Sequence, residues 1–298
     1  MKDAPPTARP PELPRVLIDT TFPPTAGYSI VDVPAESNLQ AALNNASCNP
    51  NGSILSLAAG AVFTGSFTLP AKHCAEGQWI IIRTNTADSN LPSADARINP
   101  KYAPSLAKIF SPNVAPAVKT ASGADHYWLM GVEIGVGSGV PMNYGIVAVG
   151  HGETSLADLP HHIVVDRCYV HGNPIGAIKR GIEANGAYIA VVNSYFENFH
   201  VVGQDTQAIA GWNGPGPFKI VNNFLEAAGE NVMFGGAAIT IPNVIPSDIE
   251  IRRNHFFKPL AWKPGNPAFA GAAWTVKNIL EFKDAQRVLV EGNFMENN

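Results

Sequence analysis

Cationic side chains in the second half of the chain could carry out proton-transfer chemistry. Lys179 and Arg180 are adjacent, and Lys277 follows much later. A lysine or arginine with a lowered pKa can act as a base, while a second cation neutralises a carboxylate beside the carbon that loses its proton. We therefore expect Lys179, Arg180 and Lys277 to be catalytic residues.

Oxygen-bearing side chains from the same region could hold a metal ion. Asp205, Glu230 and Asn231 offer two carboxylates and an amide oxygen. Ca²⁺ prefers hard oxygen ligands of this kind. We expect these three residues to form a calcium site.

The segment 203–218 has the composition of a sugar-binding loop. It is polar and rich in glycine, and it contains Trp212. A flat indole can stack on the apolar face of a sugar ring while neighbouring amides bond its hydroxyl groups. We expect Gln207, Trp212 and Asn213 to bind substrate; a Trp212 that only covers the edge of the core is the alternative.

These residues lie within an internal repeat, which indicates how they are positioned. The repeat reads apolar, any, apolar, any, any, small or Asn, any, apolar, with a weaker early copy at 127–134. Clear copies begin at 163, 189, 218, 249 and 288, which are 26, 29, 31 and 39 residues apart. Short strands and turns at such a period, without helices, predict one solenoid coil per repeat.

Asparagines at one position of the repeat favour a parallel β-helix. Asn223, Asn254 and Asn293 could stack at a corner and hydrogen-bond from coil to coil. Tyr169, Tyr195, Phe224 and Phe294 would form the next column. A β-sandwich is the alternative, but it provides no reason to repeat an Asn-aromatic pair.

A second strand in each coil should bring the candidate residues together. We aligned it on Ile146, Ile182, Ile209, Met233 and Ile279. Neighbours in such a column lie about 4.8 Å apart. The column two residues earlier would contain Tyr144, Arg180, Gln207, Asn231 and Lys277.

The chain from about residue 30 to 298 resembles the right-handed parallel β-helices of the pectate-lyase-like superfamily. It shares their short N-terminal helix, marked here by Leu39, Ala42, Leu43 and Ala46, with Ser37 as the expected N-cap. The resemblance implies an all-β solenoid whose open end is capped by this helix. The same fold carries lyases, hydrolases, esterases, epimerases and adhesins.

Residues 222–231 resemble a motif of the alginate and chondroitin lyases with this fold. Those enzymes place an Asn and two Glu on calcium, with a Lys base and an Arg nearby; here Asn231-Val232 replaces the second Glu. The resemblance implies a polysaccharide lyase that cleaves a uronate-containing polysaccharide by β-elimination. A non-catalytic carbohydrate-binding or surface-adhesion solenoid is one alternative. A glycoside hydrolase that pairs Asp205 with Glu230 or Glu183 is another.

The composition restricts the partners and the compartment. The 298 residues carry a net charge of −4, so we expect no nucleic-acid partner. No apolar run reaches the roughly 18 residues of a membrane span. We expect a Pro-rich flexible arm over 1–30 and one β-helix domain over 31–298. The last coil should either belong to a longer solenoid or be uncapped and form homo-oligomers. We also expect secretion or a cell-surface location with the signal peptide removed.

The cysteines and histidines give weaker signals. Cys48 and Cys74 could pair in an exported protein, whereas Cys168 lies in an apolar strand and is expected to be buried. Whether the pair is bridged stays open at this point. His161-His162 precedes a strand and is interpreted as a turn rather than a metal site.

Overall fold

The computed structural model describes residues 11–297, so part of the expected arm, residues 1–10, lies outside the described residues. Within residues 11–28 the chain runs along the outside of the solenoid. The Arg15 amide donates to Asp248, and Lys219 donates to the Ile18 carbonyl. The ring of Phe22 packs edge-on against Trp128, 5.4 Å between centroids.

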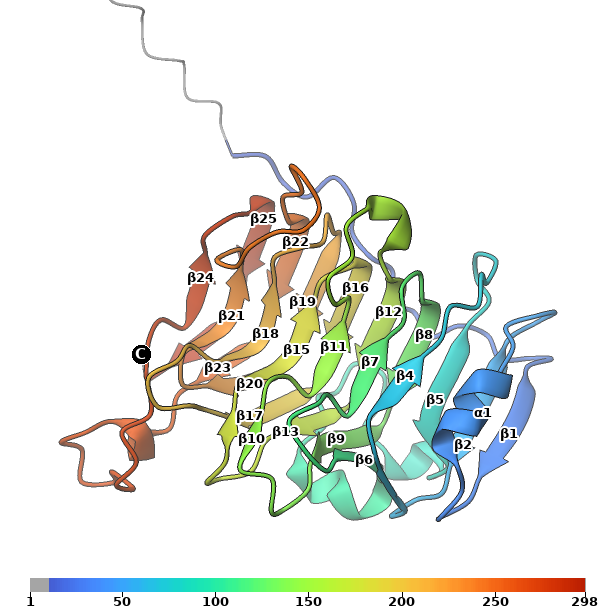
Figure 1. Ribbon diagram of the computed structural model, residues 1–298, viewed down its shortest axis with the longest axis horizontal. Coiled ribbons are helices and arrows are strands. Elements are labelled where there is room, and N and C mark those ends of the chain that lie inside the picture. The colour runs from blue at the N-terminus through green and yellow to red at the C-terminus, as the bar shows by residue number, and fades with distance from the viewer. Residues whose placement is uncertain (1–10, 298) are drawn as a thin grey trace, which may run out of the picture.

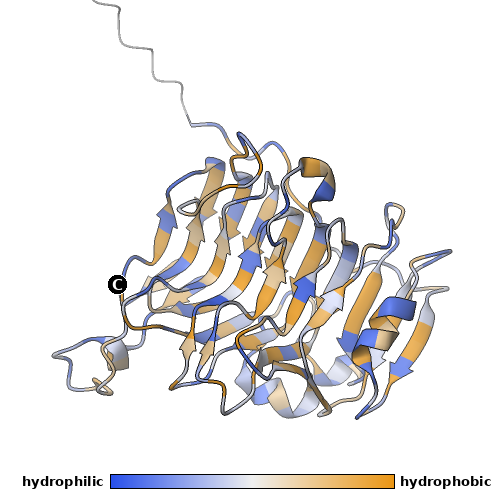
Figure 2. Ribbon diagram, viewed as in Figure 1, coloured by the Kyte–Doolittle hydropathy of each residue, from blue (hydrophilic) through white to orange (hydrophobic). Residues whose placement is uncertain are grey.

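Three parallel sheets wind around one apolar core, as Figure 1 shows. Figure 2 shows strands that are largely hydrophobic and interrupted by hydrophilic positions. The predicted parallel β-helix is confirmed. The first sheet contains β1 (Ser29–Val33), β2 (Ser53–Leu57), β5 (Ile80–Thr84), β8 (Asp125–Met130), β12 (His161–Asp166), β16 (Ala187–Val192), β19 (Phe218–Val221), β22 (Ser247–Arg252) and β25 (Gln286–Glu291).

The repeat found in the sequence is the coil of the solenoid. Its first residues pair in register across the first sheet: Tyr127, Ile163, Ile189, Phe218, Ile249 and Val288. The weak early copy at 127–134 therefore belongs to the same series.

The second sheet follows the first across a tight corner. At this corner Asn223 Nδ2 donates to Asn254 Oδ1, and Asn254 Nδ2 donates to Asn293 Oδ1, each at 3.0 Å. The left-handed backbone lies one residue earlier, as at Asn222 and Arg253. The sheet contains β3 (Val62–Thr64), β6 (Ala107–Ser111), β9 (Val132–Val136), β13 (Tyr169–His171), β17 (Tyr195–Phe199), β20 (Phe224–Ala227), β23 (His255–Phe257) and β26 (Phe294–Glu296).

The third sheet completes each coil, and its register differs from the expected one. Ile182 pairs with Val147, Ile209 with Val232, and Val232 with Leu280. The expected alignment is therefore wrong by one residue at Ile146, Met233 and Ile279. In the same register Gln207 pairs with Glu230. The sheet contains β4 (Phe67–Leu69), β7 (Val118–Thr120), β11 (Val147–Val149), β15 (Arg180–Ala184), β18 (Gln207–Gly211), β21 (Glu230–Phe234) and β24 (Leu280–Phe282); β10 (Met142–Asn143) and β14 (Ala177–Ile178) form a separate pair.

The register differs from the expected one because strands of the third sheet point two consecutive residues into the core. In β15, a Cβ on Gly181 would lie 3.0 Å from the rings of Phe196 and Phe199, and the next residue, Ile182, also belongs to the core. Side chains normally alternate along a strand, so a doubled inward pair leaves the register ambiguous in the sequence.

The helix α1 (Leu39–Asn45) covers the N-terminal end of the core. Leu39 and Leu43 are buried and face the side chains of β4, β7 and neighbouring strands (Figure 1). Its N-cap is Asn38, whose side chain accepts from the Ala41 amide at 2.9 Å, so the expected Ser37 cap is one residue off. Short 3₁₀ helices lie at Asp88–Asn90, Pro100–Ser105, Leu156–Asp158 and Leu260–Trp262.

The cysteines, the helices and the last coil were the subject of further expectations. Cys48 and Cys74 form a disulfide, and Cys168 is buried. Among the described residues, no helix has the length and apolar character needed to cross a membrane. Phe294 and Met295 on β26 are exposed, and association through this coil stays a prediction.

Candidate functional site

The outer face of the third sheet carries a continuous network of charged and amide side chains. Arg180, the first residue of β15, donates from Nε to Gln207 Oε1 at 3.0 Å and from Nη1 to Glu183 Oε1 at 3.1 Å. In-register pairing of Arg180 with Gln207 explains the first contact. The guanidinium is thereby held in one orientation.

The network continues into the next coils. Gln207 Nε2 donates to Glu230 Oε2 at 2.7 Å, and both side chains are fully buried. Lys277 Nζ lies 2.8 Å from Glu230 Oε1 and 3.0 Å from Asp205 Oδ2. Residues from three coils and two loops thus meet, because parallel strands stack their equivalent positions.

Lys277 is held in its charged form. Hydrogen bonds to Glu230 and then to Asp205 raise the pKa of its ammonium well above the ordinary range. A group that holds its proton so firmly is a poor general base near neutral pH. Lys277 therefore serves this network as a fixed cation rather than as a base.

Lys179 has the opposite electrostatic environment. Burial is the largest cause that lowers its pKa, and the neighbouring Arg180 charge adds to this. The charges of the Glu183 and Asp205 carboxylates raise the pKa of Lys179, but each by less than burial lowers it. Lys179 is therefore close enough to the network to be influenced by its charges. Its Nζ makes a long contact of 3.4 Å with Gln204 Oε1.

Trp212 joins the network, but Asn213 does not. The Arg180 guanidinium carbon lies 5.1 Å from the centre of the Trp212 ring, within cation–π range. Asn213 is buried; its Nδ2 donates to Glu153 O and Thr240 Oγ1, and its Oδ1 accepts from two backbone amides. The Asn213 side chain therefore holds loop segments together through these hydrogen bonds, none of which involves the charged network.

Asn231 also lies apart from the expected calcium ligands. Its side chain is fully buried and donates to the carbonyls of Leu225 and Phe257. A one-residue change of register reverses the face of a strand, so Glu230 points outward and Asn231 points inward.

The remaining two calcium candidates contact Lys277. Its ammonium lies between Asp205 and Glu230, in the position that a shared cation would take. These residues do not fit a Ca²⁺ site as arranged, because the Lys277 ammonium already lies between the two carboxylates and the third ligand, Asn231, faces the core.

Gln204 is the contact that sequence reasoning missed. It lies in the loop before β18, outside the repeated strand pattern, so no periodic signal could have identified it. Glu183 was considered only for hydrolysis, and the structure adds its ion pair with Arg180.

The fold and this face define a three-sheet parallel β-helix with a charged outer surface. No family model and no curated protein matches the chain. Solved structures with similarity to it include an alginate lyase from Paenibacillus sp. str. FPU-7, with 14% identity over 90% of this chain and 98% of the other, and a TM-score of 0.40. A deglycosylated pectin methylesterase from Aspergillus niger has 11% identity over 94% of this chain and 88% of the other, and a TM-score of 0.46. A PL6 family alginate lyase has 14% identity over 76% and 38%, and a TM-score of 0.30.

Proposed function

We propose that the outer face of β15, β18 and β21 is the active site of a polysaccharide lyase that acts on a uronate-containing polysaccharide. The observation that carries this proposal is the pair Lys179 and Arg180. One cation has a lowered pKa, and the other is a guanidinium fixed by Gln207 and Glu183. β-Elimination needs a base and a neutralised carboxylate at neighbouring positions.

In the proposed reaction, neutral Lys179 removes the C5 proton of a uronate. The electrons of that C–H bond form the C4–C5 double bond while the bond from C4 to the glycosidic oxygen breaks. The leaving oxygen takes a proton from solvent. Arg180 would face the uronate carboxylate, whose negative charge grows as the proton leaves, and Trp212 would stack against an adjacent ring.

Lys277, Gln207 and Glu230 support this arrangement from beneath. Gln207 links the Arg180 guanidinium to the buried Glu230 carboxylate, and Lys277 balances the charge of that carboxylate. Calcium takes no part in the proposed mechanism, because Lys277 occupies the position between Asp205 and Glu230.

A second candidate function is carbohydrate binding without cleavage. It is favoured by the balance of charge in the network, in which Glu183, Asp205 and Glu230 each contact a cation. Such a surface could hold a sugar chain through Trp212 and the exposed edges of the cations. The hydrolase alternative has less support, since Glu230 is fully buried and paired with Lys277.

One experiment separates the two candidates. The protein is incubated with alginate, polygalacturonate and chondroitin, and absorbance is recorded at about 235 nm, where unsaturated uronates absorb. Binding of each polymer is measured separately by calorimetry. An absorbance increase that disappears in Lys179→Ala supports the lyase. Binding without an absorbance change on any polymer would support the second function. The Cys48–Cys74 disulfide supports secretion or a cell-surface location as part of this proposal.

A further inference from the structure

Three histidines converge on the outside of the first sheet, away from the site described above. His161 pairs in register with Asp125, which places His126 on β8 beside His162 on β12. The rings of His126 and His162 stack with centroids 4.5 Å apart and planes 4° from parallel, and the His161 ring lies nearly perpendicular to both. One ring nitrogen of each histidine lies within 4.8 Å of one nitrogen from each of the others.

Aromatic stacking alone does not account for this geometry. His126, His162 and Tyr188 form a stacked column, which explains two of the three rings. His161 lies outside that column, yet its Nδ1 is only 2.8 Å from His162 Nδ1. At this distance the two nitrogens share a hydrogen bond, so one of them carries a proton that a bound metal ion would displace.

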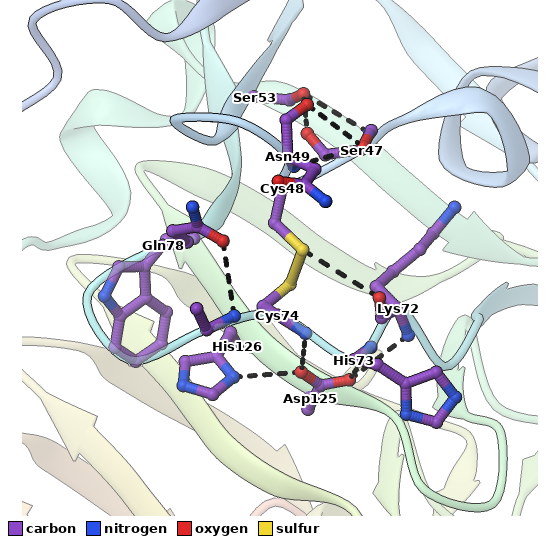
Figure 3. The surroundings of a disulfide bond; sticks show 12 residues. Ser47, Cys48, Asn49, Ser53, Lys72, His73, Cys74, Gln78, Asp125 and His126 are labelled. Carbon is purple, nitrogen blue, oxygen red and sulfur yellow. Dashed lines mark hydrogen bonds and ion pairs between the residues drawn. A yellow bond between two sulfur atoms is a disulfide. The ribbon is translucent and has the colours of Figure 1, made fainter.

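Asp125 orients the third histidine. Its carboxylate accepts the backbone amides of Lys72, His73 and Cys74, and it lies 2.9 Å from His126 Nδ1 (Figure 3). A carboxylate fixed in this way favours the proton on Nδ1 and leaves the lone pair on Nε2. Metal-binding histidines commonly have such a carboxylate behind them.

We infer that His126, His161 and His162 bind one divalent transition-metal ion of the zinc type. Imidazole nitrogens select Zn²⁺, Cu²⁺ or Ni²⁺, whereas Ca²⁺ and Mg²⁺ require oxygen ligands. The neutral form of an imidazole ring donates a nitrogen lone pair to such an ion. Cys74 Sγ is near but is bonded in the disulfide, so the fourth position is left for water.

The ion would join two successive coils at the start of β8 and β12. Asp125 would connect it further to the loop that holds the Cys48–Cys74 disulfide (Figure 3). The interpretation of His161-His162 as a turn is therefore corrected: both residues lie in β12. This inference is independent of the proposed lyase function.

The test uses the full chain without a histidine tag, loaded with Zn²⁺, dialysed and analysed for bound metal. We expect one Zn²⁺ per chain in the unmodified protein and in the control His151→Ala, which removes an exposed histidine from another loop. His162→Ala and His161→Gln should bind Zn²⁺ at least about tenfold more weakly. Co²⁺ should give a visible d–d spectrum that is absent from both variants, and excess Ca²⁺ should not compete.

Thermal unfolding in EDTA verifies that each variant is folded. If His162→Ala does not fold, the zinc affinity of His161→Gln and the Co²⁺ spectrum of the unmodified protein decide the question. The inference is overturned if the unmodified protein binds no more Zn²⁺ than the variants do. It is equally overturned if His151→Ala weakens zinc binding as much, or if Ca²⁺ displaces the metal.

Discussion

Lys277 Nζ lies 2.8 Å from Glu230 Oε1, so a lysine that is one-third exposed neutralises a carboxylate with no exposed surface. The pair joins β21 to the loop before β24. It gives Lys277 a role in stability as well as in any chemistry on this face, because a buried carboxylate without a partner is costly.

We expect Lys277→Met to lower the free energy of unfolding by on the order of 2 kcal/mol, since Glu230 is then left buried and unpaired. The partial exposure of Lys277 keeps this below the cost of breaking a fully buried pair. Urea unfolding measures the effect. The double variant Lys277→Met/Glu230→Gln should recover most of the stability. Lys283→Met removes a long, 3.7 Å contact with Glu281, which is not fully buried, and should change little. Equal effects of Lys277→Met and Lys283→Met would contradict the assignment.

Lys179→Ala should lower the lyase rate by at least about a hundredfold, the scale expected when a general base is removed. Its melting temperature should stay close to that of the unmodified protein, because the hydrogen bond from Lys179 to Gln204 is long and exposed. Lys119→Ala, an exposed lysine on β7 of the same sheet, is the matched control. A parallel decrease of melting temperature and rate would instead indicate a structural role.

The pH dependence of the rate should follow the deprotonation of Lys179. A base acts when it is neutral, so kcat/KM should rise with pH, and the lowered pKa of Lys179 moves this rise below the ordinary lysine range. The profile is measured on the polymer that the unmodified protein cleaves. A rate that falls throughout the same pH range would exclude Lys179 as the base.

Glu226 should make the fold less stable as pH rises from about 4.5 to 7. Burial, the main cause, raises its pKa from 4.5 to about 7. In this window the folded state holds a proton that the unfolded state has released, so unfolding becomes easier with increasing pH. Glu226→Gln should therefore stabilise the protein at pH 8 by about 2 kcal/mol relative to pH 4. Urea unfolding at both pH values, with exposed Glu76→Gln as control, tests this; a stabilisation independent of pH would refute it.

Removal of calcium should leave the reaction unaffected. Lys277 already lies between the carboxylates that a calcium ion would share. Initial rates in EGTA and in added Ca²⁺ should therefore agree. A rate that EGTA abolishes and Ca²⁺ restores would show that the ion displaces the Lys277 ammonium during catalysis.

Asn254→Ala should destabilise the fold by about 3 kcal/mol, because several buried groups are left without partners at once. Its Oδ1 accepts from the Asn223 amide and side chain, and its Nδ2 donates to Ile220 and Asn293. Asn293→Ala, at the last step of the ladder, should cost less. Urea unfolding of both variants provides the comparison, and a smaller effect for Asn254→Ala would contradict the ladder.

Local patterns in the amino-acid sequence were enough to predict the coil and its corner. The repeat from Ile163 to Val288 combines strand alternation with an Asn at a fixed position, and both signals are local in each coil. The structure preserves that register throughout the first sheet. It also confirms that Asn223 and Asn254 stack.

Which side chains share a surface became clear from the three-dimensional arrangement alone. In the third sheet two consecutive residues point into the core, so the sequence does not show which residues pair between strands. Asn231 was therefore expected on the outer face, whereas it is buried. His161 and His126 lie far apart in sequence and meet only when β12 pairs with β8. Local patterns specify which strands form, whereas contacts between coils depend on loop lengths and strand register that those patterns do not encode.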